Sequence, residues 1–349
     1  MPDYLGVDTS NYTTSTALFN TENGKCVQSK KLLPVKDGEL GLRQSDAVFH
    51  HVNQFSELIQ ALPLDNKKLS SVGVSTRPRN VEGSYMPCFL VGRTIAKSIG
   101  AASDIPVYET SHQIGHILAA LHSCQRLDLV LGDKTFLAFH VSGGTTDCLL
   151  VTPDVDEVIR VQEVATSLDL KAGQAVDRVG LMLGLQFPCG KELEKLAMKS
   201  CAKFKIKPMI KDGNCCLSGI ENKCRDMLNK GEDKCDIALY CLKYIEAAVL
   251  EMTAHALAKY GDMPVIYAGG VMSNMIIRKS LADKFNAFFA EPEYSCDNAC
   301  GVAIYAGLRM MMFPISSLMV SRPCSLPQLY IYSTASSSCF DGRGICVSA

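Results

Sequence analysis

Two histidines four residues apart are the part of the sequence best suited to chemistry. His112 and His116 stand at the start of an apolar segment that is predicted to be a helix. Residues four apart share one face of a helix, so both imidazoles can bind one metal ion. The zinc protease pattern requires Glu directly after the first His as general base, and Gln113 cannot serve in that role. The alternative interpretation is an ordinary pair of histidines at a helix N-terminus.

Two segments of similar sequence predict a duplicated α/β fold. Residues 4–19 align without a gap on residues 136–151, and each copy has an apolar strand, a turn of small residues and a second strand. After the first copy we expect strands and helices near residues 26–33, 48–62, 71–75, 86–101 and 105–108. After the second we expect them near 158–165, 173–185, 190–200, 236–260, 265–268 and 287–290, with helices beginning at Asn274 and Asp297. Two such units in succession indicate a duplication.

Small residues in the turns suggest phosphate binding. In a duplicated fold of this kind the two hairpin turns face each other across a cleft, where free backbone N–H groups can hold phosphate oxygens. Gly143 and Gly144 lack the Cβ that would keep an anion at a distance. A third turn, Ala268-Gly-Gly-Val-Met-Ser-Asn274, follows a strand and opens a helix. A plain tight turn is the alternative for each one alone.

The charge balance excludes a protein that binds nucleic acid through its overall field, because the net charge is −1. A local exception is the run in which Lys203, Lys205 and Lys207 alternate with Phe204 and Ile206. Such alternation would place three ammonium groups along one side of an extended segment. A solvated strand face is the simpler interpretation.

The compartment predicted from the sequence is the cytoplasm. The first residues do not resemble a leader, and no segment holds eighteen uncharged apolar residues, so no membrane association is expected. Most of the 16 cysteines lie in apolar runs and none forms a Cys-x-x-Cys pair, which favours reduced, buried thiols.

From Tyr4 to about Met312 the chain resembles the TsaD/Gcp family, the catalytic subunits of tRNA threonylcarbamoyladenosine synthesis. The resemblance implies an actin-like fold of the heat-shock chaperone and sugar kinase superfamily, with two RNase H-like lobes around a nucleotide cleft. We expect lobes over residues 1–131 and 132–312 and a tail of unknown structure over 313–349. The matching motifs are Asp8-Thr-Ser, Arg77-Pro-Arg-Asn-Val-Glu-Gly-Ser, His112-x-x-Gly-His116, Val141-Ser-Gly-Gly, Ala172-Gly-x-Ala-x-Asp177, Pro188-Cys-Gly190, Leu217-Ser-Gly, Ala268-Gly-Gly-Val-x-x-Asn274 and Cys296-Asp-Asn298.

The resemblance also implies the ligands and their residues. The metal-binding positions of the family fall on His112, His116 and Asp297, and the metal implied is one divalent ion, Fe²⁺ in many members, with Zn²⁺ or Mg²⁺ as alternatives. The nucleotide, ATP or threonylcarbamoyl-AMP, is expected at Val141, Ser142, Gly143, Gly144, Thr145, Asp177, Gly190 and Asn274.

The reaction implied is transfer of a threonylcarbamoyl group from its adenylate to the N6 amine of the adenosine beside the tRNA anticodon. Asp8 is the candidate for orienting the reacting groups. The partners implied are tRNA, a related non-catalytic TsaB-like subunit and a small TsaE-like ATPase.

The chain departs from the family pattern at Asp8, Thr145, Lys171, Gln174 and Glu221, where charge or reach in the cleft changes. Three alternatives to the transferase therefore stay open. They are a nucleotide- and metal-binding paralogue without group transfer, a metalloprotease, and a sugar-kinase-like phosphotransferase of the same fold.

Overall fold

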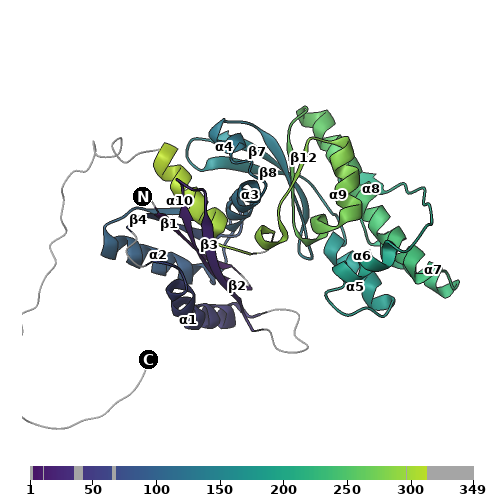
Figure 1. Ribbon diagram of the computed structural model, residues 1–349, viewed down its shortest axis with the longest axis horizontal. Helices are drawn as coiled ribbons and strands as arrows, with labels where there is room; N and C mark the ends of the chain where they lie inside the picture. The colour runs from purple at the N-terminus through teal and green to yellow at the C-terminus, as the bar shows by residue number, and fades with distance from the viewer. Residues whose placement is uncertain (1–2, 11, 35–41, 65–67, 296, 313–349) are drawn as a thin grey trace, which may run out of the picture. The chain divides into compact units, whose positions relative to one another are not determined.

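The first third of the chain forms a five-stranded mixed sheet. The computed structural model describes residues 3–10, 12–34, 42–64, 68–295 and 297–312. The sheet has the order β3-β2-β1-β4-β5 (Figure 1). Its strands are β1 (Asp3–Ser10), β2 (Thr13–Asn20), β3 (Cys26–Leu32), β4 (Leu69–Arg77) and β5 (Val107–Ser111). The first three strands are antiparallel, and β4 and β5 run parallel to β1.

The second sheet repeats this topology and confirms the predicted duplication. Its order is β12-β11-β6-β7-β8, with an antiparallel β6-β7-β8 meander and two parallel strands on the other side. The strands are β6 (Phe136–Val141), β7 (Thr146–Asp154), β8 (Val158–Thr166), β11 (Val265–Ala268) and β12 (Ala287–Phe289). Tyr4 pairs with Phe19 in the first hairpin and Phe136 with Val151 in the second, so the aligned copies share one register.

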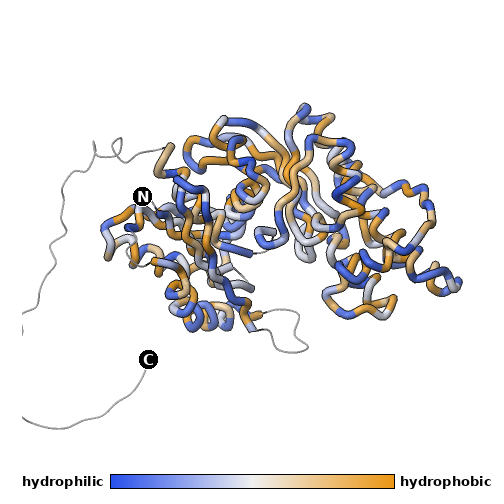
Figure 2. Tube along the Cα trace, viewed as in Figure 1, coloured by the Kyte–Doolittle hydropathy of each residue, from blue (hydrophilic) through white to orange (hydrophobic). Residues whose placement is uncertain are grey.

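Two helices lie in the layer between the sheets. On one face of the first sheet are α1 (Gln44–Gln60) and α2 (Phe89–Ser103), whose Phe55 and Ala96 pack with Leu5 and Val7. On the other face, α3 (His112–Ser123) and α10 (Cys300–Met312) share one apolar cluster with residues of both sheets. Along the helices, apolar and polar segments alternate in the tube, as expected for helices with one buried side (Figure 2).

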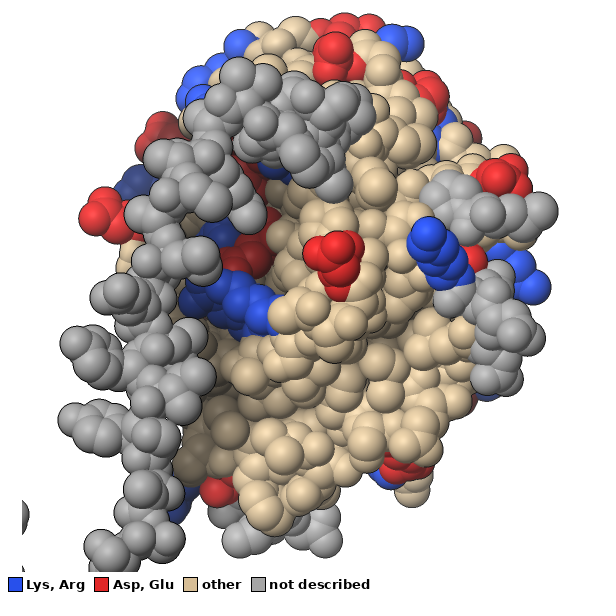
Figure 3. Space-filling model, turned by 90° about the vertical axis from the view of Figure 1, so that its left-hand side faces the viewer, with Lys and Arg blue, Asp and Glu red and all other residues tan. Residues whose placement is uncertain are grey.

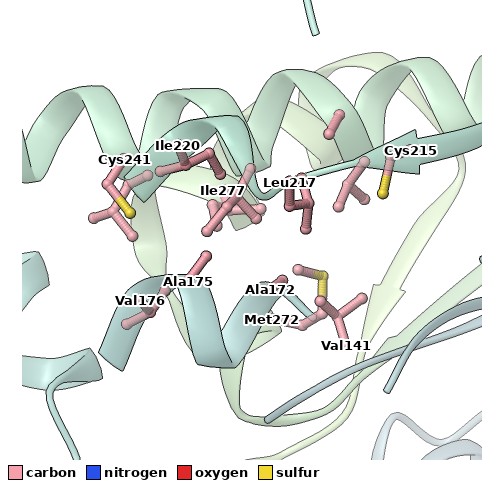
Figure 4. Packing of buried hydrophobic residues seen from close by; sticks show 14 of the residues in the cluster. Val141, Ala172, Ala175, Val176, Cys215, Leu217, Ile220, Cys241, Met272 and Ile277 are labelled. Carbon is pink, nitrogen blue, oxygen red and sulfur yellow. The ribbon is translucent and has the colours of Figure 1, made fainter. Parts of the chain in front are cut away.

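The segment between β8 and β11 adds a mostly helical layer on the far side of the second sheet. It contains α5 (Ala172–Met182), α6 (Gly190–Ala197), β9 (Met209–Lys211), β10 (Asn214–Cys216), α7 (Gly219–Asn229) and α8 (Lys234–Tyr260). Side chains of α5 point toward those of α7, α8 and α9 (Met275–Lys284) in a buried cluster that reaches Val141 (Figure 4). Short helices complete the described chain, namely α4 (Asp128–Leu131), η1 (Gly270–Ser273) and η2 (Pro292–Tyr294).

Several sequence predictions need correction in detail. The helical period through Val48, Val52 and Phe55 finds the helix and places Phe55 in its buried side, but it is wrong for Val52. Val52 is 59% exposed, and His51 is buried in that layer instead. The last helix begins at Cys300, so Asp297 lies in the segment before it. Cys26 and Cys300 form a disulfide, which contradicts the expectation of reduced thiols for these two cysteines.

The lobe boundary after residue 131 stays a prediction. Helix α10 comes from the second predicted lobe but packs against β1, β2 and β4 of the first sheet. The predicted tail, 313–349, and Cys296 lie outside the described residues. Among the residues that the structure describes, no helix has the length and apolar character required to cross a membrane.

Helices α3 and α10 cross at two glycines. A Cβ on Gly301 would lie 1.8 Å from the carbonyl oxygen of Gly115, and a Cβ on Gly115 would lie 2.9 Å from Cγ2 of Val302. Neither helix has room for a side chain at the crossing. Gly115 directly precedes His116, and Asp297 lies four residues before Gly301. The crossing therefore brings the two predicted metal-ligating segments together.

We therefore expect Gly301→Ala to destabilise the protein by about 2–3 kcal/mol, because the new methyl group overlaps backbone atoms that cannot move alone. A chain of this size should then melt roughly 5 °C lower or more. Gly219→Ala is the matched control, since a Cβ there meets no atom within 4 Å. Equal melting temperatures for the two variants in a thermal scan would contradict this account.

Candidate functional site

Local structure at the start of α3 fixes both histidines. The Ser111 hydroxyl accepts a hydrogen bond from the Ile114 backbone N–H at 3.2 Å and caps the helix. His112 is the first residue of the helix and His116 follows on the same face. Their rings are 4.3 Å apart between centroids, nearly perpendicular to each other. The Nε2 atoms of the two rings therefore lie close together on one side of the helix.

The three predicted metal ligands converge. Nε2 of His112 lies 2.8 Å from Nε2 of His116, and Oδ1 of Asp297 lies 3.4 Å and 3.3 Å from these two atoms. Ligand atoms that each sit about 2.1 Å from one ion in tetrahedral or octahedral geometry are about 2.9–3.4 Å apart. The spacing and the donor set, two imidazoles and a carboxylate, thus fit a divalent metal ion. Among the described residues, this is the one group of three or more such side chains that could hold a metal.

Asp8 contacts His112 at the ring nitrogen that does not face Asp297. Its Oδ2 is 2.6 Å from Nδ1 of His112, and its Oδ1 accepts a hydrogen bond from the Ser75 hydroxyl at 2.8 Å. The residue is 1% exposed. A carboxylate bonded to the outer nitrogen of a histidine fixes the ring and its tautomer, which leaves Nε2 free for a metal. These contacts support a role for Asp8 in positioning His112, and the predicted role of Asp8 in orienting the reacting groups stays a prediction.

Charge coupling in this group shifts two pKa values in opposite directions. Burial lowers the pKa of His112, but the carboxylates of Asp8 and Asp297 outweigh it and raise that pKa to about 10. Burial raises the pKa of Asp297, but hydrogen bonds from His112 and His116 hold that pKa well below its usual range. Without a metal ion, His112 therefore carries a proton at neutral pH.

His140 belongs to this neighbourhood and was missed in the sequence. Its ring centroid lies 5.0 Å from that of His116. Burial and the charges of His116 and His112 lower the pKa of His140 to about 3, so its imidazole is neutral. The signal was its position in the gapless alignment, where His140 corresponds to Asp8. Because Val141 follows it, His140 connects the metal-ligating residues to the glycine turn.

The glycine turn between β6 and β7 has an open backbone. Its Ser142 side chain accepts hydrogen bonds from the N–H groups of Gly144 at 3.3 Å and Thr145 at 3.2 Å. Gly143 and Gly144 are exposed, and a Cβ on either would meet no atom within 4 Å. Their open side is therefore the side from which an anion could approach.

Two other glycines hold the neighbouring segments against this turn. A Cβ on Gly173 in α5 would lie 2.6 Å from the backbone nitrogen of Gly143, and one on Gly269 would lie 2.2 Å from the carbonyl oxygen of Val141. Gly269 also has a φ of 100°, which favours glycine. The β6–β7 turn, the start of α5 and the end of β11 thus meet at one place.

Of the remaining predicted nucleotide residues, Asp177 lies in the middle of α5, and Gly190 and Asn274 lie at helix starts. Oδ1 of Asp177 accepts a hydrogen bond from the Cys189 backbone N–H at 2.9 Å, next to the exposed Gly190 that begins α6. Asn274 caps α9 by accepting hydrogen bonds from Ile276 and Ile277, and it is 7% exposed. Asp177 and Gly190 are thus adjacent and accessible, whereas the Asn274 side-chain oxygen is already used within the fold.

The departures from the family pattern have local partners. Nζ of Lys171 bonds to Thr166 Oγ1 at 3.2 Å and lies 3.9 Å from the carboxylate of Asp147. Glu221 forms ion pairs with Arg178 and Arg225. Gln174 is exposed. Lys171 and Glu221 are thus held by neighbouring side chains, whereas Gln174 faces solvent.

Comparison with known protein families identifies the family of this chain. A family model described as TsaD: tRNA N6-adenosine threonylcarbamoyltransferase matches residues 45–304. The chain belongs to the TsaD family. The match includes His112, His116 and Asp297, the glycine turn, and the α5–α8 segment. TsaD membership supports a transferase-type enzyme that acts in tRNA modification.

Solved structures confirm the fold class of this TsaD family member. HypF from T. kodakarensis is similar with a TM-score of 0.57 and 12% identity, covering 89% of this chain and 47% of that one. A full-length HypF in a phosphate- and nucleotide-bound form gives a TM-score of 0.54 at 13% identity, covering 86% and 54%. Component A of the Acidaminococcus fermentans (R)-2-hydroxyglutaryl-CoA dehydratase gives 0.50 at 16% identity, covering 88% and 98%. At such identities the likeness shows the fold alone.

We expect metal affinity to rise with pH. A metal-binding imidazole must be neutral, and His112 with a pKa of about 10 carries a proton at neutral pH in the metal-free protein. Binding below this pKa therefore releases one proton, and affinity should rise about tenfold per pH unit between pH 6 and 8. Titration with Co²⁺, followed by its visible absorption, measures this. An affinity independent of pH over that range would contradict the assignment.

Proposed function

We propose that this chain transfers a threonylcarbamoyl group from threonylcarbamoyl-AMP to the N6 amine of the adenosine next to the anticodon in tRNA. The observation that carries the proposal is the convergence of His112, His116 and Asp297 beside His140, whose ring lies 5.0 Å from that of His116. In the sequence, only Val141 separates His140 from the open glycine turn. A transferase acting on an adenylate needs a group for the phosphate and a group for the reacting carbonyl in one place. Family membership over residues 45–304 supports the same reaction.

We assign the metal to His112, His116 and Asp297, with Fe²⁺ as the proposed ion and Zn²⁺ or Mg²⁺ as alternatives. When bound, such an ion supplies Lewis-acid stabilisation of charge on a phosphate or carbonyl oxygen. Asp8 holds the His112 ring in place through Nδ1, and Ser75 in turn holds Asp8. Three protein ligands leave coordination positions for substrate.

The adenylate is assigned to the turn. The backbone N–H of Gly143 would face the phosphate, the missing Cβ of Gly144 leaves room for its oxygens, and Asp177 beside Gly190 would accept hydrogen bonds from ribose hydroxyls. Because the Asn274 side chain caps α9, its contribution is to hold the β11 end of the site in place. The nucleotide-bound form of a HypF of similar fold is compatible with this assignment.

In the proposed step the adenosine N6 attacks the carbamoyl carbon and a new C–N bond forms. The bond from that carbon to the AMP oxygen breaks, AMP leaves, and N6 loses one proton. An amine conjugated to a purine is a weak nucleophile, so positioning and electrostatic stabilisation of the leaving phosphate must supply most of the acceleration. A TsaB-like subunit, a small TsaE-like ATPase and a cytoplasmic location belong to the same proposal.

A second candidate is a paralogue that binds nucleotide and metal without group transfer. The observation that favours it is Lys171, which adds a cation near Asp147 beside the turn and changes the charge that the substrate meets. A metalloprotease is disfavoured because Gln113 stands where the protease pattern requires its general base.

We expect purified protein, supplied with the adenylate, unmodified tRNA and its partner proteins, to form the modified nucleoside. His112→Ala and Asp297→Ala should each lower the rate about 100-fold or more, since even outer residues of metal sites cost 10–100-fold. His255→Ala is the control, because that histidine is exposed on α8. Product detection by mass spectrometry, and rescue of a strain lacking its own enzyme, are the measurements. Adenylate binding without product in the unaltered protein would favour the second candidate.

Gly144→Ala tests the nucleotide assignment separately. The new methyl group enters open space, so the melting temperature and the Co²⁺ affinity should not change. The methyl group would, however, occupy the side of the turn from which the phosphate is proposed to approach, and would keep it from the backbone N–H. Loss of one charge-assisted hydrogen bond costs about 1.5–3 kcal/mol, so nucleotide affinity should fall about tenfold or more in a calorimetric titration. Unchanged affinity would place the phosphate elsewhere.

A further inference from the structure

An unusual row of lysines lies between α6 and β10. Residues 196–211 contain five lysines and no acidic residue, in a chain whose net charge is −1. Along residues 201–210 exposed and half-buried positions alternate strictly, and Lys203, Lys205 and Lys207 are all exposed. Lys211 continues the same exposed side. We call Lys203, Lys205, Lys207 and Lys211 the lysine row.

The apolar partners of the row anchor it to α8. The Phe204 ring packs edge-on against Tyr240 with 5.4 Å between centroids. The backbone N–H of Met209 donates a hydrogen bond to the Tyr244 hydroxyl at 3.2 Å. Phe204 and Ile210 both pack against the buried cluster of this layer. The backbone of the segment is therefore fixed, and its alternate side chains are held pointing outward.

The lysines of the row are free of acidic partners. Among the residues that the structure describes, none of the four is within 4 Å of a carboxylate oxygen in an ion pair, whereas Lys31, Lys195 and Lys243 each are. On another face of the molecule, charged side chains of both signs are scattered among uncharged ones (Figure 3). The row is thus a local positive feature on a nearly neutral protein.

We propose that the lysine row binds the phosphate backbone of the RNA substrate. Successive lysines in an extended segment are about 7 Å apart, which gives evenly spaced point charges for a polyanion whose charges also repeat regularly. Lysine is depleted from protein interfaces, whose cores are apolar, so a nucleic acid is the better match than an acidic protein. Such contacts set orientation and are independent of sequence. This inference rests on the proposed function, because that function supplies the RNA.

The test is a salt titration of binding with the full chain and an unmodified tRNA transcript. The variant Lys203→Gln, Lys205→Gln, Lys207→Gln should reduce the slope of log affinity against log salt by about 2–3, since each phosphate contact contributes about 0.7–0.9. The control variant Lys25→Gln, Lys68→Gln, Lys284→Gln changes the net charge equally at separate exposed positions and should leave the slope unchanged. Melting curves of both variants should match that of the unaltered protein.

An unrelated RNA stem-loop should show the same loss of slope in the row variant. The proposal is overturned if the row variant keeps the slope and affinity of the unaltered protein, or if it loses only binding to an acidic peptide. Product formation is measured in parallel. If the row variant loses salt dependence but the unaltered protein forms no product, the transferase proposal fails and the lysine row remains an RNA-binding surface. If the unaltered protein forms product but the row variant keeps the salt dependence, the transferase proposal stands and the lysine-row proposal fails.

Discussion

The close crossing of α3 and α10 is the constraint on which the rest of the structure depends. Only glycine at positions 115 and 301 lets the two backbones touch, and the contact is short enough to exclude any side chain. Asp297 precedes α10 and His116 follows Gly115, so the same contact sets the distance between a carboxylate and two imidazoles far apart in the sequence. Each sheet then packs on this helix pair from its own side.

Much of the fold could be predicted because its signals are local or repeated. The hairpins align without a gap, and strand β11 is found at the predicted residues, since a short apolar run between Pro264 and Gly269 leaves little choice of limits. The ends and faces of helices were harder. Val52 fits a helical period but is exposed, and His51 takes a place on the buried side with Phe55 and Leu58. The polar ring is tolerated there because its Nδ1 lies 2.8 Å from the Thr14 hydroxyl of β2, within hydrogen-bond distance.

The candidate site was predictable in part. The family resemblance identified Asp297 as a partner of the two histidines, which no local pattern could have done. The roles of Asp8, Ser75 and His140 depend on side chains meeting across the layer between the sheets, and one sequence does not encode such pairings locally. Nor could apolar context alone reveal which two of 16 cysteines, Cys26 and Cys300, would pair.

The shared register of the two hairpins has a consequence for the symmetry of the site. Asp8 and His140 occupy equivalent places in the two copies, and they contact the α3 histidines at His112 and His116 respectively. The same position of the repeated hairpin therefore carries a carboxyl group on one side of α3 and an imidazole on the other. Two halves with one backbone plan thus give the two histidines chemically different neighbours.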